Sequence, residues 1–145
     1  MRNFQRILPQ AAIIAVFLNG LAQLTLAQTA SAPARSVFGI YGRLAAGRDS
    51  IEITPAGGGQ IGVDLKLYFA NGHTCQLKKD GEWSGDHIAI AAEGLETSRP
   101  CHLNLFFEDR RVRLEDQGLQ CAPVYCGTRG KLDGVKLSKS TSKHK

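Results

Sequence analysis

The sequence predicts an exported all-β protein, built as a small antiparallel meander of seven or eight short strands with two disulfides. Three observations support this fold class. Apolar and polar residues alternate with period two along much of the chain, turn-forming residues separate these stretches, and an even number of cysteines follows an apolar N-terminus. A barrel and a sandwich bury the same alternating faces, so the pattern leaves the choice between them open.

The first 32 residues are predicted to be a cleavable signal peptide. Arg2 and Arg6 precede an apolar run over 11–18, which is far shorter than the roughly 20 residues that span a bilayer. Small residues favour cleavage after Ala27 or after Ala32. The alternative is an N-terminal amphipathic helix that stays in the mature fold.

Residues 33–137 are predicted to form a single β domain. The clearest strand pattern runs from Ile61 to Phe69, where every second residue is apolar. Asn71-Gly72 then indicates a two-residue hairpin, and Asp80-Gly81 a further turn. No helix is expected after the signal peptide. The predicted strand segments, in order, are 37–44, 51–53, 61–69, 74–77, 88–91, 101–107 and 111–115, followed by a closing segment over 119–134.

The four cysteines are Cys75, Cys101, Cys121 and Cys126. Small exported domains have thin cores and often add disulfides, so two disulfides are expected. Three pairings are possible. We favour Cys121–Cys126, which would close a tight loop, together with Cys75–Cys101, which would join two strand segments.

The net charge of +5 belongs mainly to the ends of the chain. Residues 33–130 carry 11 cations and 12 acids, whereas five lysines lie between positions 131 and 145. A nearly neutral body predicts no specific nucleic-acid partner. Residues 138–145 are expected to be a disordered basic tail that makes weak contact with anionic surfaces, the alternative being a solvated tail without a partner.

Residue types alone indicate no catalytic or metal centre. His73 lies two residues before Cys75, but neither a C-x-x-C pair nor H-x-x-x-H spacing occurs. Ser84, Asp86 and His87 include the residue types of a catalytic triad, yet sequence neighbours on a turn are not expected to point at one another. We therefore expect no metal, no cofactor and no enzymatic activity.

The segment 81–87 is the first candidate binding site, comprising Trp83, Ser84, Asp86 and His87. Trp83 is the only tryptophan, and an aromatic residue on a turn between rigid strands can anchor a partner. The alternative is that Trp83 caps one end of the core. The second candidate patch comprises Arg110, Arg111 and Arg113 near the aromatic pair Phe106-Phe107. Acidic residues surround these arginines, which indicates ion-paired hairpin ends.

Two motifs carry family resemblances. The segment Cys121-x4-Cys126-Gly127-Thr128-Arg129-Gly130 resembles the ending of small uncharacterised proteobacterial envelope proteins, over about Ile61 to Gly134. Separately, Ser84-Gly85 resembles the start of the Ser-Gly-x-x-Tyr loop of periplasmic lysozyme inhibitors, although Ile88 replaces the tyrosine. That second resemblance implies a small β-barrel that inserts a loop into the lysozyme cleft.

These observations predict a periplasmic or secreted, non-catalytic binding protein of the bacterial envelope. Its expected partner is a protein or an envelope polymer, with inhibition of lysozyme or another cell-wall enzyme as the sharpest version. The alternatives are a structural or assembly component of the envelope and a cell-wall hydrolase.

Overall fold

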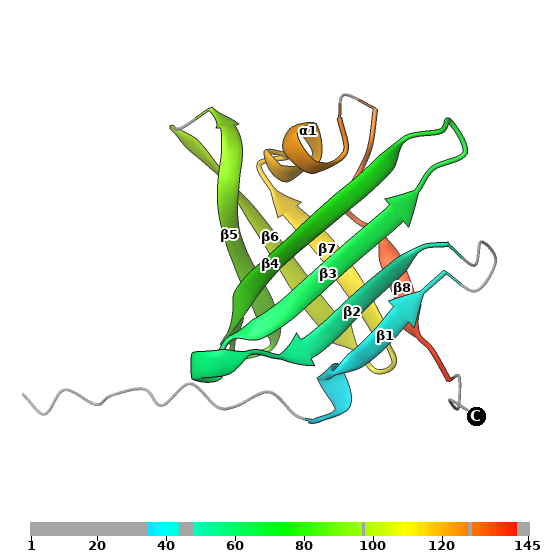
Figure 1. The fold of residues 1–145 in the computed structure, drawn as a ribbon, viewed down its shortest axis with the longest axis vertical. Coiled ribbons are helices and arrows are strands. Elements are labelled where there is room, and N and C mark those ends of the chain that lie inside the picture. The colour runs from blue at the N-terminus through cyan, green and yellow to red at the C-terminus, as the bar shows by residue number, and fades with distance from the viewer. Residues whose placement is uncertain (1–34, 44–47, 97, 128, 142–145) are drawn as a thin grey trace, which may run out of the picture.

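The computed structural model describes residues 35–43, 48–96, 98–127 and 129–141. Its eight antiparallel strands form a closed barrel in which each strand pairs with its sequence neighbours and β8 pairs with β1 (Figure 1). The predicted all-β meander is therefore confirmed, and the barrel is selected over the sandwich. The strands are β1 (Gly39–Gly42), β2 (Ser50–Pro55), β3 (Ile61–Tyr68), β4 (Thr74–Ser84), β5 (His87–Glu96), β6 (Arg99–Glu108), β7 (Arg111–Gln117) and β8 (Lys136–Lys139).

The barrel interior is the hydrophobic core, and the period-two pattern decides which residues enter it. On β3, Ile61, Val63, Leu65 and Leu67 are each at most 2% exposed, while the residues between them face outward. Successive side chains of a strand point to opposite faces, so closing the sheet puts every second residue inside. The predicted apolar face of this strand is confirmed.

Two short 3-10 turns and one α-helix complete the described fold. The turns are η1 (Arg35–Val37) and η2 (Gly57–Gly59), and the helix is α1 (Cys121–Tyr125). The expectation of no helix after the signal peptide is therefore wrong, because α1 is a short α-helix in this region. No helix among the described residues is long and apolar enough to cross a membrane.

Strand β8 corrects the predicted start of the C-terminal tail. Ser138 and Lys139, assigned to the tail, pair with Gly42 and Tyr41 of β1. Ser138 also pairs with Arg111 of β7, so the same strand closes the barrel on both sides. Pairing between strands satisfies the backbone hydrogen bonds even where the side chains are polar. The Lys- and Ser-rich composition of this segment therefore did not reveal that it forms a strand. The predicted signal peptide and residues 142–145 lie outside the described residues.

The turn after β4 lies further along the chain than predicted. Asp80-Gly81 is inside β4, and the chain reverses at Gly85-Asp86 between the paired residues Ser84 and His87. A Cβ atom at position 81 would lie 2.7 Å from Cγ2 of Ile88 and 2.9 Å from the Ala89 carbonyl oxygen. Glycine is therefore needed at position 81 for close packing of β5 and not for a turn.

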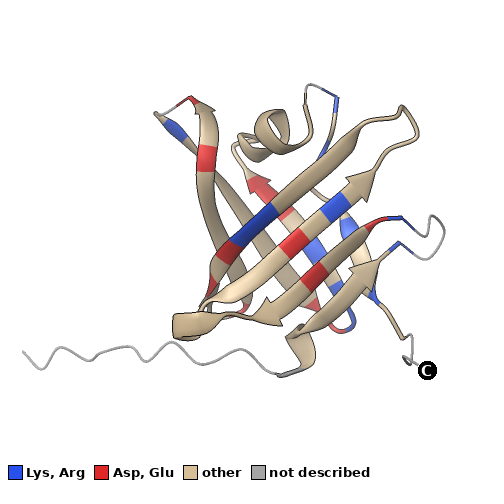
Figure 2. Cartoon of the chain, viewed as in Figure 1, with Lys and Arg blue, Asp and Glu red and all other residues tan. Residues whose placement is uncertain are grey.

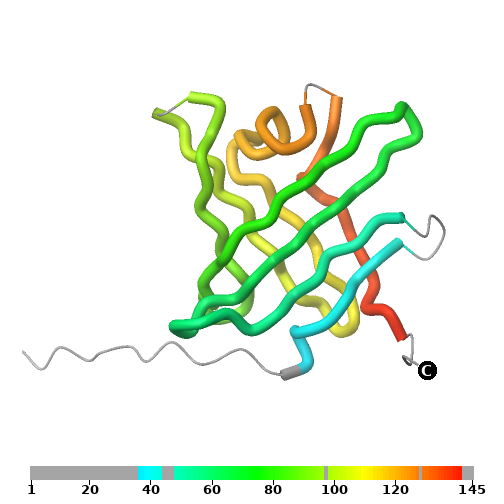
Figure 3. The backbone as a smooth tube through the Cα atoms, viewed as in Figure 1, coloured from blue at the N-terminus to red at the C-terminus, as the bar shows by residue number. Residues whose placement is uncertain are grey.

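Strands β4 and β5 separate soon after this hairpin. Only three residue pairs join them, from Ser84↔His87 to Glu82↔Ala89, although both strands continue for several residues. Figure 3 shows the backbone of β5 diverging from β4, and Figure 1 shows α1 near the resulting opening. Helix α1 contacts both strands and so covers the end of the barrel where their pairing has stopped.

The disulfides are Cys75–Cys126 and Cys101–Cys121, so both predicted pairings are wrong. Cys121 begins α1 and Cys126 directly follows it, and the two ends of the helix are tied to different strands, β6 and β4. The predicted Cys121–Cys126 disulfide would instead have joined the two ends of the helix to each other, with no disulfide from the helix to the sheet. Two disulfides and no free cysteine among the described residues indicate an oxidising compartment.

Candidate binding surface

Trp83 packs inside the barrel and not on an exposed loop. It lies on β4 opposite Ile88, and its ring centroid is 5.9 Å from that of Phe107, which is 6.0 Å from that of Tyr41. The side chain is half-buried against the core, and its Nε1 is buried without a hydrogen-bond partner. This geometry matches the alternative interpretation, in which Trp83 caps one end of the core.

The remaining residues of the first candidate site form the tip of the β4–β5 hairpin. Ser84 and Asp86 are exposed, with Asp86 80% exposed at its side chain. Oδ1 of Asp86 lies 2.8 Å from Nδ1 of His87. Hydrogen bonding from His87 lowers the pKa of the Asp86 carboxyl below its ordinary value. The expectation that these neighbours would not point at one another is wrong for this pair.

A row of three stacked side chains crosses the outer face of β5, β6 and β7. The register places His87 beside Phe106, and Phe106 beside Arg113. The His87 ring stacks on Phe106 with centroids 4.8 Å apart, and the Arg113 guanidinium lies 4.7 Å from the same ring centre. We call His87, Phe106 and Arg113 the stacked row. The row therefore connects His87 of the first predicted site with Arg113 of the second predicted patch through the ring of Phe106.

Two carboxylates hold the Arg113 end of the stacked row. Nε of Arg113 donates to Glu108 at 3.2 Å, and Nη1 donates to Glu115 at 3.3 Å. Lys136 on β8 lies 3.6 Å from the other oxygen of Glu108. The hydrogen bond from Arg113 and the charge of Lys136 lower the pKa of Glu108. The predicted ion-paired hairpin end is therefore present around Arg113.

Arg110 and Arg111 lie apart from the stacked row, at the β6–β7 turn and the start of β7. Both are exposed, and no carboxylate among the described residues lies within ion-pair distance of either guanidinium. The backbone N–H of Lys139 donates to the Arg110 carbonyl at 2.7 Å, which brings β8 alongside this turn. The second predicted patch is thus divided, with Arg113 paired and Arg110 and Arg111 presented to solvent.

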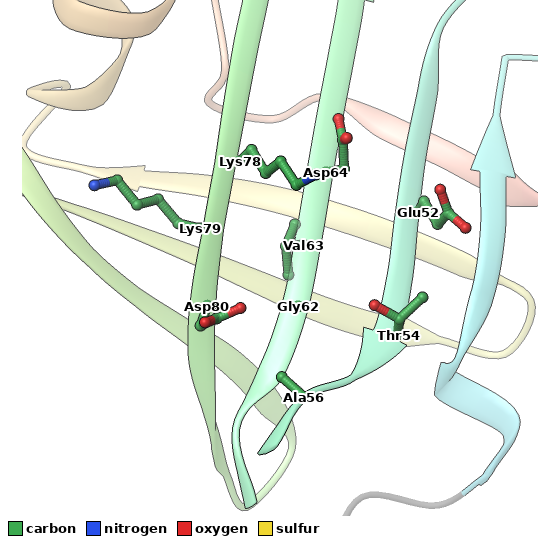
Figure 4. Close-up of a pocket in the computed structure, with 9 residues that line it drawn as sticks. All are labelled: Glu52, Thr54, Ala56, Gly62, Val63, Asp64, Lys78, Lys79 and Asp80. Atoms are coloured by element: carbon green, nitrogen blue, oxygen red, sulfur yellow. The ribbon is translucent and has the colours of Figure 1, made fainter. Parts of the chain in front are cut away.

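Elsewhere on the surface, acidic and basic residues are interspersed along the strands (Figure 2). A shallow hollow lies over Gly62, where the lack of a side chain leaves space between Thr54 and Asp80 (Figure 4). Lys78 lies opposite Asp64 in the register of β3 and β4, and Lys78 and Lys79 both line this hollow together with acidic residues. A mixture of acidic and basic side chains of this kind is typical of a solvated strand face.

The described residues contain no arrangement typical of a metal site or a nucleophilic centre. No group of three or more His, Cys, Asp and Glu side chains among them is placed to hold a metal ion. Asp86 and His87 form the acid–imidazole part of a triad. In the described structure, however, no serine hydroxyl hydrogen-bonds to the His87 ring, which instead stacks on Phe106.

Phe106 is the residue whose role sequence reasoning missed. Its outward direction follows from its place in the alternation, because Leu105 and Phe107 on either side face inward. That signal is present in the sequence, but the register that puts His87 and Arg113 on the two sides of Phe106 is not.

Comparison with protein-family models, with curated proteins and with solved structures yields no match to this chain. The fold and the described surface are therefore the basis for the functional argument.

Proposed function

We propose that the protein is an exported, non-catalytic binding protein of the bacterial envelope, periplasmic or secreted, that contacts a protein partner through the tip of the β4–β5 hairpin and the stacked row. The sharpest version is inhibition of lysozyme or another cell-wall enzyme. The observation that carries this proposal is the stacked row itself, because it places an aromatic ring, an imidazole and a guanidinium side by side on the outer face of a closed barrel.

Preorganisation supports a binding role for this surface. The hairpin turn has only two residues, Gly85 and Asp86, and the side chains behind it are fixed by stacking and ion pairs. A surface that is already ordered loses little conformational entropy when it binds. Aromatic and arginine side chains also supply a large share of the binding energy in protein interfaces. The exposed Asp86 carboxylate suits a cleft that offers cations or N–H donors.

The first test is a pull-down with the exported protein, produced from the full-length chain, against purified muramidases. A muramidase activity assay with increasing amounts of the protein accompanies it. We expect capture and inhibition by the natural protein and loss of both on Asp86→Asn or Phe106→Ala. Glu52→Gln, which alters an exposed acid of β2 away from the hairpin, is the matched control. Equal capture by the Phe106→Ala and Glu52→Gln variants would remove the stacked row from the proposal.

A second test addresses the enzyme alternative directly. The purified protein is incubated with peptidoglycan, and the release of soluble fragments is measured. We expect no release above the background of the His87→Gln variant, because no serine hydroxyl in the described structure hydrogen-bonds to the His87 ring. Release that depends on His87 would overturn the non-catalytic proposal.

A second candidate function is contact with an anionic envelope surface through Arg110 and Arg111. The observation that favours it is that both guanidinium groups are exposed and lack an ion-pair partner among the described residues. Vesicles with and without anionic lipid test it. We expect salt-sensitive binding that Arg110→Gln/Arg111→Gln weakens, and an unchanged affinity would reject this role.

A further inference from the structure

A polar hollow with an alanine floor lies on the outer face of β5 and β6. Ala89 and Ala91 face outward because Ile88 and Ile90 are buried in the core. Across the strands, Ala89 is paired with Asn104 and Ala91 with His102. The two methyl groups are much shorter than the side chains around them, so the surface is recessed by about 490 Å³. Small-molecule sites commonly occupy roughly 300–1,000 Å³.

The rim of this hollow is polar and comes from several strands. Outward-facing positions on β4, β5, β6 and β7 contribute carboxylates, imidazoles and carboxamides, and one more carboxamide comes from the residue before β3. The polar side chains that line it are Asp80, Glu82, His87, His102, Asn104, Gln117 and Gln60. Neither lysine nor arginine lines the hollow.

Asn104 is the feature that distinguishes this hollow from an ordinary strand face. It faces outward between the buried Leu103 and Leu105, yet it is only 6% exposed. No hydrogen bond joins its carboxamide to another residue in the described parts of the chain. Its amide atoms are not among the fully buried polar atoms that lack a partner, so the carboxamide reaches the hollow and can pair there with water or with a ligand. A ligand seated over Ala89 would be beside this amide.

The chemistry of the rim limits the class of ligand. Two carboxylates and no cation disfavour phosphate, sulfate and acidic polymers, because these would bring like charges together. Carboxamides both donate and accept, and carboxylates accept, which matches hydroxyl groups that can do either. We propose that this hollow binds an uncharged, hydroxyl-rich ligand, a saccharide unit, with Asn104 donating to and accepting from its hydroxyl or amide groups. This site shares His87 with the proposed protein-binding surface, but its floor and its other rim residues lie outside that surface, and the proposal does not depend on it.

The test uses NMR titration of the natural protein with N-acetylglucosamine trimer and, separately, with maltotriose. We expect saturable shifts of the Asn104 side-chain NH2 signals and of the Ala89 and Ala91 signals with at least one of the two. The absence of saturable shifts with both sugars at millimolar concentration would overturn the proposal. Saturable shifts at these residues with spermidine but with neither sugar would also overturn it, in favour of a cation site.

A variant that fills the hollow tests whether the saccharide binds there. Ala91→Val adds bulk at the floor while keeping a residue that strands favour, so the barrel is expected to remain folded. Gln76→Val, on an outward position of β4 that does not line the hollow, is the control. We expect Ala91→Val to weaken saccharide binding about tenfold or more and Gln76→Val to leave it unchanged. Equal affinities for the two variants, with unchanged thermal midpoints, would contradict the proposed position.

Discussion

Cys75 on β4 and Cys126, which directly follows α1, are joined by a disulfide across a sequence separation of 51 residues. The other end of the helix is tied to β6 through Cys121 and Cys101. Strand β5 lies between β4 and β6 in the barrel order. The two disulfides and α1 therefore bridge the strands on both sides of β5, at the end of the barrel where β4 and β5 have ceased to pair.

The longer disulfide is expected to stabilise the fold more than the shorter one. In the chain-entropy model, a loop of 51 residues is worth about 4 kcal/mol and one of 20 residues about 3 kcal/mol. We expect the double variant Cys75→Ala/Cys126→Ala to lose more unfolding free energy than Cys101→Ala/Cys121→Ala. Urea denaturation under oxidising conditions measures both. The reverse order would show that loop length does not control the effect.

Asp116 is expected to be a major determinant of the position of α1. Its buried carboxylate accepts hydrogen bonds from the backbone N–H groups of Cys121 at 2.9 Å and Ala122 at 2.8 Å. Hydrogen bonds to a charged group contribute about 1.5–3 kcal/mol each. We expect Asp116→Ala to lower the free energy of unfolding by at least about 2 kcal/mol, measured by chemical denaturation. Asp109→Asn, at an exposed turn position with φ of 54°, is the control and should change little.

Trp83→Ala is expected to destabilise the barrel and not merely to remove a surface contact. Truncation of a core tryptophan to alanine commonly costs about 3–5 kcal/mol, and the partial exposure of Trp83 favours the lower end. Trp83→Phe keeps an aromatic ring beside Phe107 and removes a buried N–H that has no partner. We therefore expect Trp83→Phe to unfold at a higher temperature than Trp83→Ala. A native-like thermal midpoint for Trp83→Ala would contradict the core role.

Two C-terminal deletions are expected to have different effects. Removing residues 138–145 deletes half of β8, including the pairs that Ser138 and Lys139 make with β1 and β7. We expect that deletion to abolish cooperative unfolding or to lower the thermal midpoint strongly. Removing residues 142–145 leaves the described barrel complete and should preserve the midpoint. Only the shorter deletion is therefore suitable for testing what the terminal lysines do.

The pKa values of Asp86 and Glu108 are expected to show whether the pairs that these carboxyls make with His87 and Arg113 of the stacked row form in solution. The pKa of Asp86 is lowered by its hydrogen bond with His87, and that of Glu108 by Arg113 and Lys136. For a lowered pKa, the stabilisation is present above the unfolded value and is lost as the pH falls through the folded value. We expect His87→Gln to raise the Asp86 pKa toward its ordinary value and Arg113→Gln to raise that of Glu108.

Carbon-detected NMR titration of the carboxyl groups measures both values, and each variant is the control for the other. His87→Gln should leave the Glu108 pKa in place, and Arg113→Gln should leave that of Asp86 in place. If neither pKa moves in the variant of its own partner, the pairs do not form in solution.

Elements that depend on local alternation were predictable. The pattern from Ile61 to Leu67 appears as expected, because side-chain direction follows from neighbouring residues. The chain also reverses around Asn71-Gly72, but the expected two-residue turn is wrong, because five residues separate the last paired residues, Tyr68 and Thr74. The β4–β5 turn was misplaced, since Asp80-Gly81 has the composition of a turn. Gly81 is instead needed for the close approach of Ile88, and that contact arises only when β5 packs over β4.

The candidate surfaces were predictable only in part. Asp86 and His87 were selected from one short segment, and the structure brings them together. The roles of Trp83 and Arg113 depended on which face of a strand each residue occupies and on what lies opposite. Phe106 joins the stacked row through the β5–β6 and β6–β7 registers, which no local pattern specifies.

The amino-acid sequence by itself determined the all-β class, the alternating core faces and the presence of two disulfides, because these follow from period-two patterning and from an even number of cysteines. The tertiary structure alone decided that the sheet closes as a barrel and that β8 completes it. It also decided that the disulfides tie the ends of α1 to Cys75 and Cys101, and which side chains form the stacked row. Each of these depends on residues far apart in the chain, which come into contact only through strand order and register.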